Sequence, residues 1–141
     1  MKTITGITRS HLDEVTREIN AAAIEIHRQL GPGLIESVYH RCMEYELEVR
    51  RLNFVSELEV PITYKTISVN GVLRCDFLVE DCIVLELKAV LQMMPIFDAQ
   101  LLTYMKILKV PKGILINFNS SRIMGEGQKT LVNEHFFNLG K

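Results

Sequence analysis

Two runs decide the fold of this chain: residues 74–79, Arg74-Cys75-Asp76-Phe77-Leu78-Val79, and residues 83–88, Ile83-Val84-Leu85-Glu86-Leu87-Lys88. Both are rich in apolar residues, and the segment Glu80-Asp81-Cys82 separates them, so they predict two antiparallel strands joined by a short loop. A loop with an odd number of residues places Asp76 opposite Glu86 and keeps each face uniform in character. One face then carries Cys75, Phe77, Val79, Ile83, Leu85 and Leu87, and the other carries Arg74, Asp76, Glu86 and Lys88. The hairpin therefore gathers its charges on one face.

The opposed acids, Asp76 and Glu86, indicate a cation site. Opposite residues of an antiparallel pair have Cβ atoms about 5 Å apart, and two carboxylates at that spacing oppose each other's ionisation unless a cation lies between them. Oxygen ligands with room for water suit Mg²⁺. Lys88, on the same face, can contact a metal-bound water or a phosphate, and such a set is typical of phosphodiester hydrolysis.

A solvated surface is the usual meaning of an isolated Glu-x-Lys motif. Here, however, Glu86 and Lys88 lie in an otherwise apolar strand, and helical segments on either side of that strand in the sequence are expected to cover it. A buried charge is costly unless it is paired or bound to a metal. This context favours a functional site over a solvated face.

The flanking sequence predicts two helices before any strand. Apolar residues at steps of three and four extend from Leu12 to Leu30, the pattern of an amphipathic helix, and Gly31-Pro32-Gly33 ends it. A second helix is expected from about Ile35 to Arg51. Its apolar stripe is expected to consist of Val38, Cys42, Tyr45 and Val49.

The remaining segments predict strands and one more helix. Alternation between Phe54 and Tyr64 predicts a strand, which Pro61 places near a sheet edge. Asn70-Gly71 favours the tight turn of a hairpin. A helix is expected from Pro95 up to Val110-Pro111, and the apolar run from Gly113 to Phe118 is typical of a strand covered on both faces. The predicted order is α-α-β-β-β-α-β with a less regular tail, in a single domain over residues 1–141.

Composition narrows the functional classes. The 141 residues include 16 Lys and Arg against 17 Asp and Glu, and 48% are hydrophobic, which describes a folded globular domain rather than a disordered, collagen-like or coiled-coil chain. A net charge of −1 argues against nucleic-acid binding by bulk electrostatics, so any phosphate contact is local or metal-assisted.

Cysteine usage and hydropathy indicate the compartment. Cys42, Cys75 and Cys82 form no Cys-x-x-Cys pair and are odd in number, so we expect buried, reduced residues rather than disulfides or a zinc site. The start of the chain, residues 1–17, lacks the apolar core of a signal peptide, and no apolar run reaches about 18 residues. We expect a cytoplasmic protein that is neither secreted nor membrane-spanning.

Five ordered segments resemble a known family. Residues 33–39, Gly-Leu-Ile-Glu-Ser-Val-Tyr, match a Gly-x-x-Glu-x-x-Tyr signature, and four segments follow it in order: 75–79, 86–89, 100–104 and 116–119. From about Ile19 to Asn119 the chain is similar to the GxxExxY family, part of the PD-(D/E)XK nuclease superfamily. The resemblance implies an α/β fold of the restriction-endonuclease type: an αβββαβ core, a mixed central sheet flanked by helices, and here an extra N-terminal helix.

The same resemblance implies roles for the acidic and basic residues. Asp76 and Glu86 would be the metal-binding carboxylates, and Lys88 would position or activate the attacking water. Glu36 would be an additional acid that reaches the metal from a helix. An ordinary acid in the first turn of a helix is the other interpretation of Glu36. Cys75 stands where the superfamily often has proline.

Three further residues would contact substrate. Tyr39 follows Glu36 at i+3 and is expected on the same helix face, and Gln100 and Tyr104, at i and i+4, are expected to face the site from the next helix. His11, His40 and His135 show no ligand spacing, so no function is assigned to them, and His27 is expected to be a solvated or capping residue at the end of the first helix.

The leading hypothesis is a Mg²⁺-dependent nuclease that cleaves DNA, with Mn²⁺ as a substitute ion and homodimerisation as a further expectation. The main alternative is a non-catalytic nucleic-acid-binding or protein-interaction module that retains the fold. A metal-dependent phosphatase acting on a small phosphoester is a third interpretation, because the charged face alone does not specify a polymer.

Overall fold

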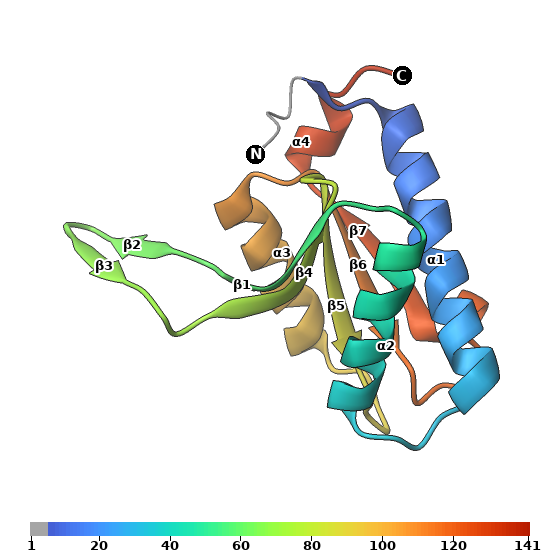
Figure 1. The fold of residues 1–141 in the computed structure, drawn as a ribbon. Helices are drawn as coiled ribbons and strands as arrows, with labels where there is room; N and C mark the ends of the chain where they lie inside the picture. Colours follow the sequence, from blue (N-terminus) through green and yellow to red (C-terminus); the bar gives the residue numbers. More distant parts are fainter. Residues whose placement is uncertain (1–5) are drawn as a thin grey trace.

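A five-stranded mixed sheet lies between helices on its two faces (Figure 1). The computed structural model describes residues 6–141. The expectation that residues 1–17 contain no signal peptide therefore falls partly, at residues 1–5, outside the described residues. The strand order is β1-β4-β5-β6-β7, and β5 and β6 are parallel while the other neighbours are antiparallel. A separate two-stranded ribbon, β2–β3, projects away from these layers (Figure 1).

In chain order the elements are α1 (Arg9–Leu30), α2 (Glu36–Val49), β1 (Phe54–Glu59), β2 (Ile62–Tyr64), β3 (Ile67–Val69), β4 (Arg74–Val79), β5 (Ile83–Lys88), α3 (Pro95–Leu108), β6 (Lys112–Asn117), the π-helical turn η2 (Ile123–Gly127), β7 (Gln128–Val132) and α4 (Glu134–Phe137). The series α2-β1-β4-β5-α3-β6 is the expected αβββαβ core. The β2–β3 ribbon is inserted between its first two strands, and β7 extends its sheet.

The first helix agrees with its pattern, whereas the buried face of the second does not. Helix α1 begins after Thr8, whose side chain accepts the His11 backbone N–H, and ends at Gly31, whose φ of +67° favours glycine. In α2 the buried residues are Tyr39, Met43 and Leu47. The expected stripe of Val38, Cys42, Tyr45 and Val49 is therefore wrong, because packing against α1 and the sheet selects an adjacent stripe.

The strands also depart from the prediction at two places. The expected strand from Phe54 to Tyr64 is interrupted at Val60-Pro61, so its first part is β1, an edge strand of the large sheet, and its second part is β2. The ribbon turns at Lys65-Thr66 rather than at Asn70-Gly71, since Tyr64 pairs with Ile67. The predicted hairpin turn is thus wrong. The tail contains a regular strand, β7, that the sequence analysis did not predict.

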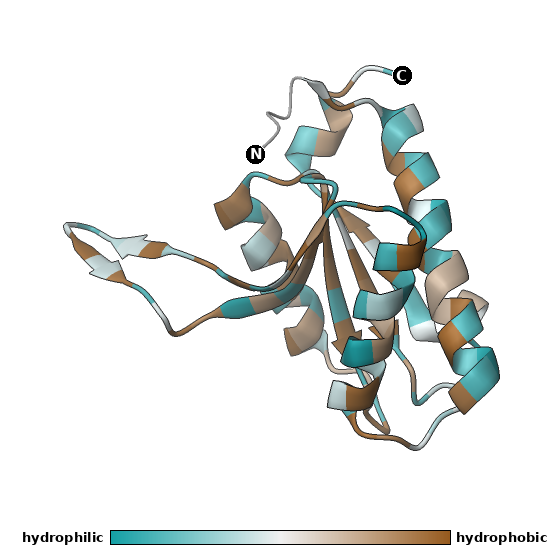
Figure 2. Ribbon diagram, viewed as in Figure 1, coloured by the Kyte–Doolittle hydropathy of each residue, from teal (hydrophilic) through white to brown (hydrophobic). Residues whose placement is uncertain are grey.

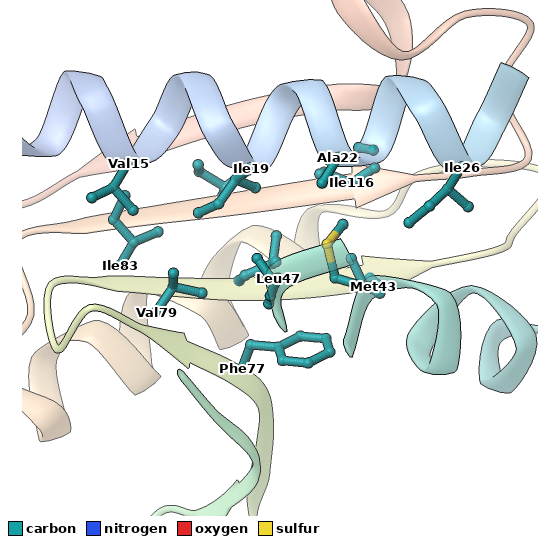
Figure 3. Close-up of a cluster of buried hydrophobic side chains, with 14 of the residues drawn as sticks. Val15, Ile19, Ala22, Ile26, Met43, Leu47, Phe77, Val79, Ile83 and Ile116 are labelled. Carbon is teal, nitrogen blue, oxygen red and sulfur yellow. The ribbon is translucent and has the colours of Figure 1, made fainter. Parts of the chain in front are cut away.

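Two apolar clusters, one on each face of the sheet, hold the layers together. Helices α1 and α2 cover one face (Figure 3), and α3 covers the other. The inner strands are correspondingly apolar (Figure 2), and every residue of β6 is buried. Helix α3 approaches β6 closely at Gly113, where a Cβ atom would lie 2.6 Å from the Met105 sulfur. Within residues 6–141 no helix is both long and apolar enough to cross a membrane.

Candidate functional site

At Asp76 the described pairing of β4 ends on the β5 side and is interrupted on the β1 side. Between β4 and β5 the ladder includes Phe77↔Leu85 as its last described pair toward this end. Between β1 and β4 the described register passes from Ser56↔Phe77 to Leu58↔Cys75, and Glu57, opposite Asp76, has a φ of +53°. Asp76 therefore lies where the described β4–β5 ladder has ended and where the β1–β4 ladder, which resumes at Leu58↔Cys75, is broken.

Carboxylates replace the missing ladder bonds at this point. Glu86 Oε2 accepts the Asp76 backbone N–H at 2.5 Å, and Asp76 Oδ2 accepts the Leu87 backbone N–H at 2.7 Å. Each acid thus uses one oxygen to bind the opposite strand, and the second oxygen of each remains for other partners. The sequence placed these two acids opposite each other, and the structure brings them together in that register.

Burial controls the protonation of this pair. Glu86 is only 5% exposed, and burial, followed by the negative charge of Asp76, raises the pKa of Glu86 to about 8. Burial also raises the pKa of Asp76, although the Leu87 N–H opposes this change. Two carboxyl groups in this environment favour a bound cation or a retained proton.

Lys88 and helix α3 close one side of the site. The Lys88 ammonium lies over the Phe97 ring, 4.5 Å from its centroid, and its positive charge acts to lower the pKa of both Asp76 and Glu86. Gln100 is exposed on α3, and Tyr104, one helical turn further along, is buried. The side chain of Gln100 forms a hydrogen bond with Tyr104. Burial and the nearby charge of Glu86 raise the pKa of Tyr104. Gln100 and Tyr104 therefore lie on the side of α3 that faces the acids.

A pocket of about 440 Å³ opens on the other side, between α2 and the strands. Glu36, His40, Glu57 and Asp76 are among its lining residues. Burial and the charge of Asp76 raise the pKa of Glu36. The structure thus brings Glu36 and Asp76 to one pocket, as the family resemblance implied.

His40 is a site residue that sequence reasoning missed. Its Nδ1 lies 3.9 Å from Asp76 Oδ1, its Nε2 lies 2.8 Å from Ser56 Oγ, and its ring stacks on Phe77. Ser56 Oγ in turn donates to Glu44 at 2.7 Å. The available signal was the spacing, because His40 follows Glu36 at i+4 and so shares its helix face.

Tyr39 does not belong to the exposed part of this site. Its side chain is fully buried and stacks on Phe118 with 4.5 Å between ring centroids. Its hydroxyl donates to the Gly31 carbonyl at 2.6 Å and accepts the Leu34 N–H at 3.2 Å. The expectation that Tyr39 binds substrate is not supported by this geometry. Tyr39 instead fixes the loop that leads from α1 to Glu36.

Cys75 also lies on a different face from the one predicted. It packs in the cluster under α3 with Leu78 and Val84, whereas Phe77 packs under α1 and α2. The break in pairing at Asp76 explains this difference, because strict alternation requires a regular strand. Burial raises the pKa of the Cys75 thiol to about 12, as expected for an unreactive packing residue. Cys42 is partly exposed rather than buried, and within residues 6–141 none of the three cysteines forms a disulfide.

Comparison with known proteins identifies the class. A family model described as PD-(D/E)XK nuclease superfamily matches residues 13–130. The chain belongs to this superfamily, and the restriction-endonuclease-like fold expected from the sequence is confirmed. Neither the curated proteins nor the solved structures include a significant match.

Members of this superfamily generally act as nucleases, use divalent metal ions and bind nucleic acid. The chemistry of Asp76 and Glu86 fits such an ion, because both offer carboxylate oxygens, the ligands that Mg²⁺ prefers. Burial is the largest cause of the raised pKa values of both carboxyl groups, and a cation bound between them would lower these values. Within residues 6–141, however, no three Asp, Glu, His or Cys side chains converge closely enough to form a complete ligand set.

Proposed function

We propose that this protein is a metal-dependent nuclease of the GxxExxY type that hydrolyses phosphodiester bonds in DNA. The observation that carries the proposal is the buried pair of Asp76 and Glu86, each anchored by a backbone N–H of the opposite strand, with Lys88 two residues further on. Residues 1–141 are assigned to one nuclease-like domain, and the cytoplasm is its proposed location.

Asp76 and Glu86 would hold Mg²⁺, with Mn²⁺ as a substitute and Glu36 as a further acid at the mouth of the pocket. When bound, the metal supplies a Lewis acid that makes the attacking water more acidic. Lys88 positions that water and stabilises the negative charge that develops on the phosphate. The backbone N–H bonds keep both carboxylates oriented before substrate arrives.

Gln100 and Tyr104 are assigned to substrate positioning. Gln100 is exposed on α3 beside Tyr104, so its amide can reach a phosphate or a base. Tyr104 is buried, so its contribution is to orient Gln100 through their hydrogen bond. Substitution of Gln100 is therefore expected to raise KM more than it lowers kcat.

The experiment is a cleavage assay on single-stranded, duplex and branched DNA with Mg²⁺, Mn²⁺ or chelator. We expect metal-dependent cleavage by the parent and a loss of roughly hundredfold or more in Lys88→Ala. Lys106→Ala is the matched control, because Lys106 is exposed near the other end of α3. Calorimetric metal binding should disappear in Asp76→Asn and Glu86→Gln. A parent that neither binds metal nor cleaves any of these substrates would overturn the proposal.

One observation favours a second candidate, a non-catalytic nucleic-acid-binding module with the same fold. In the part of the chain that the structure describes, no three Asp, Glu, His or Cys side chains form a complete ligand set, and Asp76 and Glu86 each use one carboxylate oxygen to accept a backbone N–H. DNA binding that survives chelation, without cleavage of any substrate, would support this candidate.

A further inference from the structure

The β2–β3 ribbon is the part of the described chain that the layered fold does not use. It projects from the body between β1 and β4 (Figure 1). Its register pairs Ile62 with Val69 and Tyr64 with Ile67, so these four side chains share one face, whereas Thr63 and Ser68 share the other. Tyr64 is 60% exposed and Ile67 56% exposed. The ribbon thus presents an apolar face outside the core (Figure 2).

A two-stranded ribbon of this kind is marginally stable in water by itself. An exposed apolar surface on such an element indicates contact with a partner. The question is therefore the chemistry of that partner, and the charges on the ribbon bear on it.

Charge favours a polyanion. The chain as a whole has a net charge of −1, yet residues 60–75 contain no Asp or Glu and include Lys65 and Arg74. Lys65 lies at the turn, and its ammonium is 5.4 Å from the centroid of the Tyr64 ring. An aromatic ring beside a lysine is suited to stacking on a base while the ammonium contacts phosphate.

Position favours the same partner. The return strand of the ribbon leads directly into β4, and Arg74, the first residue of β4, is two residues from Asp76. A nucleic acid strand at Asp76 would therefore lie beside the base of the ribbon. The ribbon and the candidate site are continuous along the chain.

We propose that the β2–β3 ribbon is a nucleic-acid-binding arm, with Tyr64 stacking on a base and Lys65 contacting phosphate. The proposal rests on the proposed function for the chemical class of the ligand. It does not require a bound metal or a cleavage step.

The test measures binding of labelled single-stranded and duplex DNA by fluorescence anisotropy in chelator, which prevents metal-dependent cleavage. Tyr64→Ala is expected to weaken binding by roughly fivefold or more, the lower range for loss of one stacked base. Tyr64→Phe keeps the ring and should bind like the parent. Lys65→Asn should reduce the slope of log K against log salt by roughly 0.7–0.9, the effect of one phosphate contact.

Lys109→Asn is the matched control for Lys65→Asn. Both lysines are exposed and have a positive φ, +52° for Lys65 and +57° for Lys109, and asparagine tolerates this conformation. Lys109 caps the C-terminal end of α3, so its substitution should leave the salt slope unchanged. Circular dichroism should show the same fold in every variant, because the ribbon lies outside both core clusters.

Three results would overturn the arm. The first is that Tyr64→Ala and Lys65→Asn bind DNA with the same affinity as the parent. The second is that the parent binds neither single-stranded nor duplex DNA. The third is that the parent is a dimer which Tyr64→Ala converts to a monomer without any change in DNA affinity. The last result would assign the apolar face to a second copy of the chain. Absence of cleavage with arm-dependent binding intact would overturn the nuclease proposal alone.

Discussion

The two ends of the β4–β5 hairpin differ in what holds the strands together. At the end nearer the turn, backbone pairs such as Val79↔Ile83 form a regular ladder with apolar side chains on both faces. At the other end, the carboxylates of Asp76 and Glu86 accept the backbone N–H groups instead. The end nearer the turn therefore stabilises the fold. The other end holds two ionisable carboxyl groups in a fixed position, and their burial lowers stability.

The largest effect on the free energy of unfolding is expected at the regular end of the hairpin, nearer the turn. Ile83→Ala removes a fully buried side chain in the cluster under α1, so the free energy of unfolding should fall by about 2–5 kcal/mol. Chemical denaturation measures this change. Leu91→Ala is the control, because Leu91 is 97% exposed and its loss should change stability by less than about 0.5 kcal/mol. Equal stability of the two variants would contradict this view of the hairpin.

The next effect concerns pH at the open end. The pKa of Glu86 is raised from 4.5 to about 8, so over this range the folded protein binds more protons than the unfolded chain. The free energy of unfolding should therefore decrease as pH rises between these values. Glu86→Gln should make this decrease shallower. Glu14→Gln, at an exposed position of α1, should leave it unchanged, and a parent whose stability rises over this range would contradict the prediction.

Added metal should reverse part of that loss. Mg²⁺ at a hundredfold excess over its Kd would stabilise the folded protein by about 2.7 kcal/mol. The stabilisation should be larger at about pH 8 than at about pH 6, because the carboxylates must be ionised to bind. Thermal unfolding with and without Mg²⁺ measures it, and Asp76→Asn should abolish it. An equal Mg²⁺ effect in the variant would place the metal elsewhere.

The smallest effect is expected at His40, which links the open end to α2. His40→Ala removes a contact with Ser56 and the stacking on Phe77, so stability should fall by about 1 kcal/mol. Denaturation of His40→Ala beside His135→Ala, on the short helix α4, makes the comparison. If the two substitutions have the same effect, His40 does not couple α2 to the strands.

Most of the fold and the central acids were predictable because they depend on short-range patterns. The spacing of apolar residues identified α1, and the bounds of β5 and the first residue of α3 agree with the expectations for those segments. The odd loop between β4 and β5 set the register that brings Asp76 and Glu86 together. Local period and loop length suffice for such predictions, because a slip of one residue would bury charges.

Other features depended on which neighbour each segment meets. The buried face of α2 required α1 and the sheet to choose between adjacent stripes, and the burial of Tyr39 followed from that choice. The ribbon turn moved from Asn70-Gly71 to Lys65-Thr66 because pairing of Tyr64 with Ile67 places the apolar residues of both strands on one face. The α2 outcome depends on contacts between segments distant in the sequence, whereas the ribbon turn depends on which of two local pairings within residues 62–73 forms.

The sequence by itself determined the order of the core elements, the opposition of Asp76 and Glu86, and the place of Lys88 beside them. Only the tertiary structure decided that the carboxylates bind backbone N–H groups across the strands, that His40 joins Asp76, and that the β2–β3 ribbon stands outside the layers. The physical reason is range. Periodicity and register act within a few residues. The burial of the acids, the electrostatic effect of neighbouring charges on them and the pocket beside Asp76 arise only when α2, α3 and the strands pack together.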